Sequence, residues 1–197
     1  MSDAVDRRRR AAQAGHEGDA AGARQLLADS DASVRAAAVG ALSRMGALTD
    51  TEARAALGDP DATVRRRACA AAVGLGGVDV RPLLDDDDAS VVEAAAWALG
   101  EQGESAADAV DRLSTIGQEH PDPHCREAAV AALGAIGDRQ GLAAVLRAAG
   151  RDRPAVRRRA VIALAAFDGP EVDAALQQAL QDRDWQVRQA AEDLLAQ

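Results

Sequence analysis

Residues with metal-ligand chemistry gather in one short segment, His120-Pro-Asp-Pro-His124, followed directly by Cys125. Imidazole nitrogens and a thiolate suit zinc, but a structural zinc site needs a fourth ligand in ordered tetrahedral geometry. The two prolines predict an irregular turn, and no fourth ligand can be named from the sequence. Cys125 also occupies a position where most related segments of this chain carry Val, so it is expected to be buried. We therefore predict no metal site and no cofactor.

Two arginine runs, Arg65-Arg66-Arg67 and Arg157-Arg158-Arg159, have the charge that nucleic-acid binding requires. The whole chain opposes this interpretation, because 32 acidic residues outnumber 23 basic ones and the net charge is −9. No aromatic platform for stacking bases accompanies the arginines. The composition therefore disfavours nucleic acid and anionic membranes as partners. The acidic run Asp85–Asp88 is interpreted as a tight turn ending in a helix cap, with only weak support for a divalent-ion site.

Catalytic motifs are missing from the sequence. It contains no nucleophile elbow, P-loop, Gly-rich dinucleotide turn or convergent carboxylate pair. The acidic residues recur with a regular period, as helix caps and solvated faces do, whereas catalytic residues would break such a period. We therefore expect a protein that is not an enzyme.

The period appears when the chain is aligned on itself. Six segments superpose without gaps on a two-residue anchor, which is mostly Val-Arg: Val34-Arg35, Val64-Arg65, Val91-Val92, Cys125-Arg126, Val156-Arg157 and Val187-Arg188. Four residues after the anchor every segment has Ala, and eight after it five of the six have Leu. Twelve after it stand Gly46, Gly76, Gly103 and Gly137, where Gly ends a helix at little conformational cost.

The spacing of these apolar columns is helical, and each segment is expected to form a helix with one buried face. Aspartate lies three residues before most anchors, where an N-cap belongs. A shorter amphipathic helix is expected before each of these second helices, including one near residues 79–84. The predicted fold is an all-α, right-handed α-solenoid (superhelix) of about six helix-pair repeats. The predicted boundaries are a capping helix and linker at 1–18 and one array at 19–197, with repeats at about 19–46, 47–76, 77–103, 104–137, 138–168 and 169–197.

Segments such as Asp61-Ala-Thr-Val-Arg-Arg-Arg-Ala68 and Asp122-Pro-His-Cys-Arg-Glu-Ala-Ala-Val-Ala-Ala-Leu-Gly134 resemble HEAT-like repeats of the phycobilisome-lyase type. The resemblance extends from about Ala20 to the end of the sequence. It implies that second helices line a concave face and that motif Asp and Arg side chains stack in a ladder between repeats. The ladder residues it implies are Asp31, Arg35, Asp61, Arg65, Asp88, Asp122, Arg126, Arg157, Asp184 and Arg188. Val92 replaces the arginine of the third repeat, so an interruption is expected there.

The family resembled includes bilin lyase subunits, adaptors and scaffolds, so it says little about activity. HEAT-like hydroxylases that bind iron use several His-Glu pairs on facing helices. This sequence has only His16-Glu17, in a segment flanked by Gly15 and Gly18, so that activity is not expected.

If second helices line a concave face, the columns two, six and nine residues after the anchor point at a ligand. Trp97 stands out on this otherwise small-residue strip, because Trp and Arg dominate interface hot spots. Trp97 is either an interface anchor or a space-filling residue between adjacent helices. The expected partner-binding residues are Arg66, Glu93, Trp97, Glu127, Arg158 and Ile162. The leading hypothesis is an interaction scaffold or adaptor that binds a protein segment, and the alternatives are a bilin lyase or isomerase subunit and a nucleic-acid-binding protein.

Cellular context is only outlined by the composition. The two cysteines, Cys69 and Cys125, are far apart and make no disulfide framework, which favours a reducing cytoplasm. No apolar run approaches the length of a membrane span, so membrane insertion is not expected. The absence of Lys and Asn suggests either a GC-rich genome or a salt-adapted cell.

Overall fold

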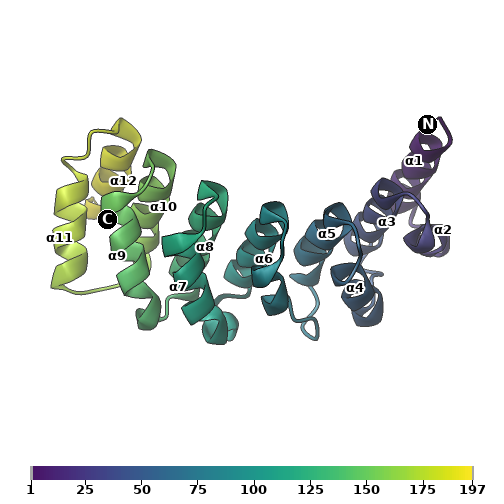
Figure 1. The fold of residues 1–197 in the computed structure, drawn as a ribbon, viewed down its shortest axis with the longest axis horizontal. Coiled ribbons are helices and arrows are strands. Elements are labelled where there is room, and N and C mark those ends of the chain that lie inside the picture. The colour runs from purple at the N-terminus through teal and green to yellow at the C-terminus, as the bar shows by residue number, and fades with distance from the viewer. Residues whose placement is uncertain (1, 197) are drawn as a thin grey trace. The chain divides into compact units, whose positions relative to one another are not determined.

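The computed structural model describes residues 2–196, and these residues form helices and loops without a β-strand. The fold is an α-solenoid of helix pairs, as the sequence period predicts (Figure 1). The chain divides into two compact units, Met1–Ala95 and Ala96–Gln197. The boundary falls within helix α6 (Ala89–Gln102).

The first unit consists of the N-terminal helix and the following helix pairs. Its elements are α1 (Ser2–Glu17), α2 (Ala20–Gln25), η1 (Leu26–Ala28), α3 (Ala32–Arg44), α4 (Asp50–Leu57), α5 (Ala62–Ala72) and η2 (Arg81–Asp85), where η marks a 3₁₀ helix. Helices α1, α3 and α5 pack in succession, and α2 and α4 pack against α3 and α5 (Figure 1).

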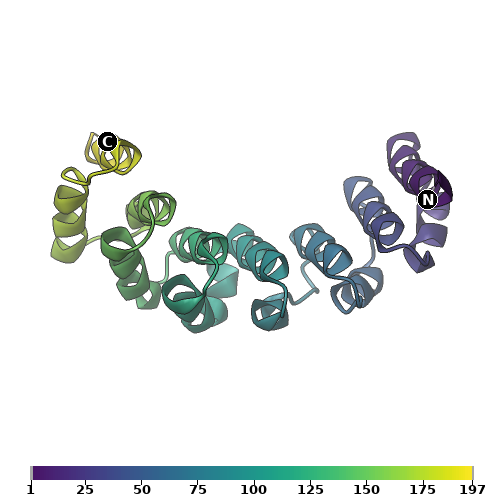
Figure 2. The same cartoon turned by 45° about the horizontal axis from the view of Figure 1, so that its top comes forward.

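The second unit continues the same pairing. Its elements are η3 (Gly103–Ala109), α7 (Val110–Glu119), α8 (Pro123–Ile136), η4 (Arg139–Gly141), α9 (Leu142–Arg151), α10 (Pro154–Ala163), η5 (Leu164–Ala166), α11 (Pro170–Ala179) and α12 (Trp185–Leu195). Second helices α8, α10 and α12 pack in a row, and α7, α9 and α11 form the adjoining row (Figure 2).

The core of each unit is built from the repeated columns. The alanines four residues after each anchor are completely buried in all six second helices: Ala38, Ala68, Ala95, Ala129, Ala160 and Ala191. A methyl side chain there lets the neighbouring helix approach closely. Eight residues after the anchor the core is also buried, except at Leu195, which is exposed. The helical phase deduced from the period is therefore confirmed.

Helix starts follow the aspartate pattern. The side chains of Asp31, Asp61, Asp122 and Asp184 each accept the backbone N–H of the second residue of their helix. Asp88 does the same for Ser90. These bonds satisfy N–H groups that have no partner within a helix.

Three local features differ from the sequence expectations. The segment near 79–84 forms only the short 3₁₀ helix η2, because Gly76, Gly77 and Pro82 leave too few residues for an α-helix. Gly46, Gly103 and Gly137 adopt positive φ as expected, but Gly76 does not, since α5 already ends at Ala72. Helix α1 extends to Glu17, so His16 and Glu17 lie within this helix and not in the linker that was expected before residue 19.

Candidate functional site

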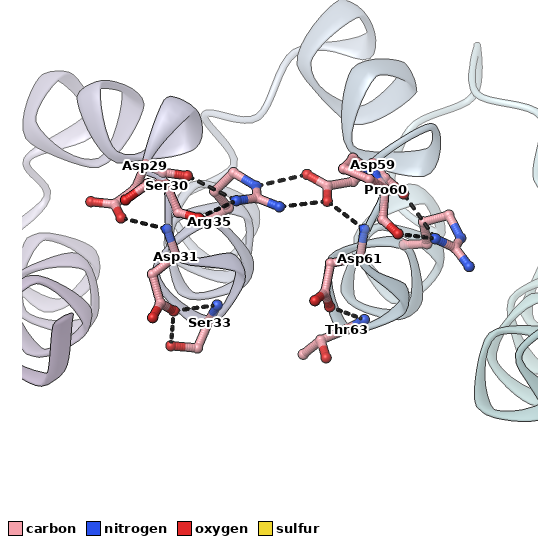
Figure 3. A network of polar contacts seen from close by, with 10 residues as sticks. Asp29, Ser30, Asp31, Ser33, Arg35, Asp59, Pro60, Asp61 and Thr63 are labelled. Atoms are coloured by element: carbon pink, nitrogen blue, oxygen red, sulfur yellow. Dashed lines mark hydrogen bonds and ion pairs between the residues drawn. The ribbon is translucent and has the colours of Figure 1, made fainter. Parts of the chain in front are cut away.

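The polar chemistry of the first unit is concentrated at the N-terminal ends of the second helices, and Arg35 illustrates its geometry (Figure 3). Nε and Nη2 of Arg35 donate to the two carboxylate oxygens of Asp59 at 2.8 and 2.7 Å. Nη1 of the same guanidinium donates to the carbonyl oxygen of Asp29 at 2.8 Å. Asp59 in turn accepts the backbone N–H of Asp61 at 2.9 Å. One arginine therefore connects the loop of its own repeat to the loop of the next.

This arrangement recurs in both units and forms an arginine–aspartate ladder. Its bidentate pairs are Arg7–Asp29, Arg35–Asp59 and Arg65–Asp86 in the first unit, and Arg126–Asp152 and Arg157–Asp182 in the second. The shortest N–O distance in each pair is 2.6–2.7 Å. Arg7 belongs to α1, so this helix supplies a ladder residue as the second helices do.

The ladder aspartates are not the ones that the family resemblance implied. The structure uses Asp31, Asp61, Asp88, Asp122 and Asp184 as caps, and pairs the arginines with acids that precede the caps. The reason is that each cap carboxylate is already bound to its own helix N-terminus. The preceding aspartate accepts the cap residue's backbone N–H on one carboxylate oxygen, while both of its oxygens accept from the arginine of the previous repeat.

The ladder lacks both partners at one step. Val92 replaces the arginine, and His120 replaces the aspartate that this arginine would bind in the next repeat. His120 stands two residues before the cap Asp122, where other repeats carry the ladder aspartate. Its Nδ1 accepts the N–H of Asp122 at 3.1 Å, and its carbonyl oxygen accepts from Nη1 of Arg126 at 2.7 Å. His120 therefore keeps the part of the aspartate's role that orders the loop, without its carboxylate.

The ladder shifts the ionisation of its members. Hydrogen bonding from Arg35 holds the pKa of Asp59 below its ordinary value, and the pKa of Arg35 is raised by the same bond. Hydrogen bonding from Arg157 likewise lowers the pKa of Asp182. The ladder is therefore fully charged at neutral pH, which is a structural role and not the poised ionisation of a general acid or base.

The second unit carries a surface on its second helices that matches several of the expected partner-binding residues. Trp97 on α6 is 45% exposed, and Ile162 on α10 is 38% exposed. Arg158 is exposed on α10 without an ion pair in the described part of the chain, and Glu127 on α8 pairs with Arg159 at 3.5 Å. The outward helical phase assigned to Trp97 and Ile162 is thus correct. We call Trp97, Glu127, Arg158 and Ile162 the anchor surface.

Arg66 and Glu93, the other expected contact residues, lie in the first unit. Both side chains are exposed, Arg66 on α5 and Glu93 on α6. Neither makes an ion pair within residues 2–196.

Two glycines of the column nine residues after the anchor, Gly100 and Gly134, serve packing in the second unit, contrary to the expectation that the column points at a ligand. A Cβ added at Gly134 would lie 2.6 Å from Cβ of Ala163. A Cβ added at Gly100 would lie 3.1 Å from Cα of Ala132. These glycines let α6 and α8, and α8 and α10, approach closely beneath the anchor surface.

The residues with metal-ligand chemistry do not form a ligand set. His124 lies beside Asp122 at 3.0 Å, and Cys125 is buried. Burial raises the pKa of the Cys69 thiol to about 12, so this cysteine is neither a thiolate ligand nor a nucleophile at neutral pH. In the region that the structure describes, no three His, Cys, Asp or Glu side chains are grouped so that they could hold a metal ion. Within Asp85–Asp88, Asp86 belongs to the ladder and Asp88 is a cap.

Sequence reasoning missed one prominent side chain, Trp185. It is the first residue of α12 and is 63% exposed. The column alone could have identified it, because the other second helices have Ala or Pro at this position.

Comparisons with known proteins agree with the repeat fold described above. The family model for HEAT repeats matches residues 110–196. The complex of CpcE and CpcF of phycocyanin lyase from Nostoc sp. PCC7120 is 25% identical, with a TM-score of 0.65, covering 89% of this chain and 75% of that one. YibA of E. coli is 18% identical, with a TM-score of 0.69, covering 89% of this chain and 66% of that one. Residues 110–196 thus match the HEAT-repeat model, and the fold of the chain is that of HEAT-like repeat proteins.

Engineered solenoids share the same fold. A designed armadillo repeat protein in complex with the peptide (KR)4 is 16% identical, with a TM-score of 0.65, covering 88% of this chain and 96% of that one. No curated protein matches the sequence significantly. No helix in residues 2–196 has the length and apolar content that a membrane span requires.

Proposed function

We propose that this chain is a non-enzymatic scaffold or adaptor that binds a segment of a partner protein on its second helices. The observation that carries the proposal is the ring of Trp97, which is 45% exposed on a second helix. Large aromatic side chains such as tryptophan contribute much of the binding energy at protein interfaces.

The anchor surface also suggests what the partner segment is like. Ile162 adds a second apolar contact, while Glu127 and Arg158 add opposite charges on neighbouring helices. A segment with an apolar side chain flanked by charges of both signs would complement it. Arg66 and Glu93 are further contact residues of the first unit in this proposal. The fold likeness to a designed peptide-binding solenoid is compatible with it.

The test is capture of a partner from the organism's own extract by the wild-type chain, by Trp97→Ala and by Val5→Ala. Val5 is an exposed apolar residue of α1 and serves as the matched control. We expect the wild type and the control to retain one protein partner and Trp97→Ala to lose at least about 90% of it, because anchor truncation costs about 2 kcal/mol or more. Equal capture by all three forms would contradict the proposal.

Fluorescence gives an independent readout, because the chain contains only two tryptophans. Trp185→Phe leaves Trp97 as the single emitter, and Trp97→Phe leaves Trp185. Addition of the captured partner should shift the emission of Trp97 to shorter wavelength as its ring leaves water, while the emission of Trp185 stays unchanged. No shift in the Trp185→Phe form would place the contact elsewhere.

The likeness to the CpcE–CpcF phycocyanin lyase complex favours a second candidate, a subunit of a bilin lyase or isomerase. This function predicts a tetrapyrrole that copurifies with the chain and gives visible absorbance. Absorbance retained by both the wild type and Trp97→Ala would favour the lyase subunit over the scaffold.

A further inference from the structure

Helix α12 presents a stripe of four side chains on the face that other second helices use for packing. Trp185, Arg188, Glu192 and Leu195 are spaced three, four and three residues apart, so they share one helical face. Trp185 is the most exposed large apolar side chain of the described residues, and Leu195 is 43% exposed. We call these four residues the α12 stripe.

The corresponding face of α8 and α10 packs against the next repeat. On α8 this face contains Val130 and Leu133, and on α10 it contains Val161 and Leu164, all of them buried. Nothing in residues 2–196 covers the α12 stripe, so it is the unpartnered face of the second unit.

Arg188 within the stripe has an unused hydrogen-bonding edge. Its Nη1 donates to the carbonyl oxygen of Asp182 at 2.7 Å, as the ladder arginines of the other second helices do to their own loops. Those arginines also direct Nε and Nη2 to a carboxylate, but Arg188 has no such partner in the described chain. Its guanidinium is therefore held in place with the bidentate edge open to a carboxylate.

Glu192 indicates that another repeat of the same kind is not the best occupant. In the other second helices this column contains Val39, Cys69, Ala96, Val130 and Val161, all buried. A glutamate at this position would be buried against an ordinary following repeat, where an unpaired carboxylate is costly. The occupant should instead offer a cation opposite Glu192 and a carboxylate opposite Arg188.

A second copy of α12 meets both requirements. The stripe is symmetric about position 190, because Trp185 and Leu195 are each five residues from it and Arg188 and Glu192 are each two residues from it. When two copies pack antiparallel about a two-fold axis at this position, Trp185 of one faces Leu195 of the other. In the same arrangement Arg188 of each faces Glu192 of the other. An isologous interface requires this kind of self-complementarity.

We propose that the α12 stripe is a homodimerisation surface, with two Arg188–Glu192 ion pairs between copies flanked by two Trp185–Leu195 contacts. Within one chain Arg188 and Glu192 are four residues apart but do not pair, and arginine before glutamate is the less favourable order for an intrahelical pair. Both side chains are therefore available to the second copy. The proposal is independent of the scaffold function, since it uses none of the anchor surface.

Charge reversal provides the test, with sedimentation velocity of the full chain over about 1–500 µM, since one-helix interfaces are small and give weak complexes. We expect the wild type to show a concentration-dependent monomer–dimer equilibrium. Arg188→Glu and Glu192→Arg should each weaken dimerisation at least tenfold, because symmetry places every reversed charge in the interface twice. Arg183→Glu, which changes an exposed arginine off the stripe, should leave the equilibrium unchanged.

Mixing the two variants makes the test specific. The stripe of the Arg188→Glu variant carries two acidic side chains, and the stripe of the Glu192→Arg variant carries two arginines. Each acidic side chain then faces an arginine across the interface, so an equimolar mixture should form heterodimers although each variant alone dimerises at least tenfold more weakly than the wild type. The double variant Arg188→Glu with Glu192→Arg should regain the homodimer.

These rescues also show that each variant is folded. A wild type that stays monomeric at all concentrations, dimers unaffected by either reversal, or no rescue in the mixture would overturn the proposal.

Discussion

At the scale of single residues, the geometry of the ladder explains why its cations are arginines and not lysines. A ladder arginine bonds two partners at once, with Nε and Nη2 on the carboxylate of the next repeat and Nη1 on carbonyl groups of its own loop. The ammonium group of lysine cannot present this planar fork. The guanidinium also remains charged when it is largely buried, as at Arg157, which is 4% exposed.

Arg157 and Arg158 are adjacent in sequence and offer a matched comparison. Arg157→Ala should lower the free energy of unfolding by about 2–4 kcal/mol, because it removes the counter-charge of the largely buried Asp182 carboxylate and the side-chain donor to a loop carbonyl. Asp182 then keeps only the backbone N–H of Asp184 as a donor. Arg158→Ala removes an exposed, unpaired side chain and should change stability by less than about 0.5 kcal/mol. Urea unfolding monitored by circular dichroism measures both. Equal effects of the two substitutions would mean that the ladder does not stabilise the second unit.

At the scale of elements, close contact between second helices depends on small residues at defined positions. Gly134 on α8 faces the backbone and Cβ of Ala163 on α10, so the two helices meet where no side chain intervenes. A mid-helix glycine normally costs about 1 kcal/mol relative to alanine. At this position the close approach of the two helices offsets that cost.

Gly134→Ala should therefore destabilise the chain, by about 1–3 kcal/mol, because the new Cβ would overlap Ala163 and force the helices apart. Gly150→Ala is the control, since Gly150 lies in α9 with no atom within 4 Å of the added methyl group. The control should stabilise by about 0.5–1 kcal/mol through helix propensity. Thermal unfolding of the two variants distinguishes them, and a stabilising Gly134→Ala would show that α8 and α10 do not approach this closely.

At the scale of the whole molecule, the ladder makes stability depend on pH. Asp59, Asp86 and Asp182 have a pKa below the ordinary value because they accept hydrogen bonds from Arg35, Arg65 and Arg157. A carboxylate whose pKa is lower in the folded state stabilises the fold fully above its unfolded pKa. That stabilisation is lost as pH falls through the folded pKa.

We therefore expect the melting temperature to be nearly constant above about pH 5 and to fall steeply below about pH 4, where unfolded aspartates begin to bind protons. Arg157→Ala should show a smaller fall, because one of the responsible pairs is already absent. Melting curves between about pH 2 and 7, followed by circular dichroism, check both statements, and stability that rises on acidification would contradict them.

Local sequence signals predicted the helices better than they predicted the contacts between repeats. The apolar columns and the cap aspartates predicted the second helices, because helical phase and N-capping depend on residues only a few positions apart. Asp59 was not recognised as a partner of Arg35, since the two are 24 residues apart and the nearby Asp61 has the same chemistry. Helical phase favoured exposure of Trp97 but left a space-filling position between helices open, and the structure shows the side chain exposed. Its role in binding stays a prediction.

Periodicity in the sequence was sufficient to predict an all-helical repeat protein with buried alanine columns and aspartate caps. These features depend on periodicity, which is a property of the chain alone. The folded structure was needed to show which aspartates form the ladder and that Gly100 and Gly134 let helices approach closely in the second unit. It was also needed to show that nothing within residues 2–196 covers the α12 stripe. Each of these depends on where one repeat lies against another, and that placement is fixed by packing and paired charges distant in the sequence.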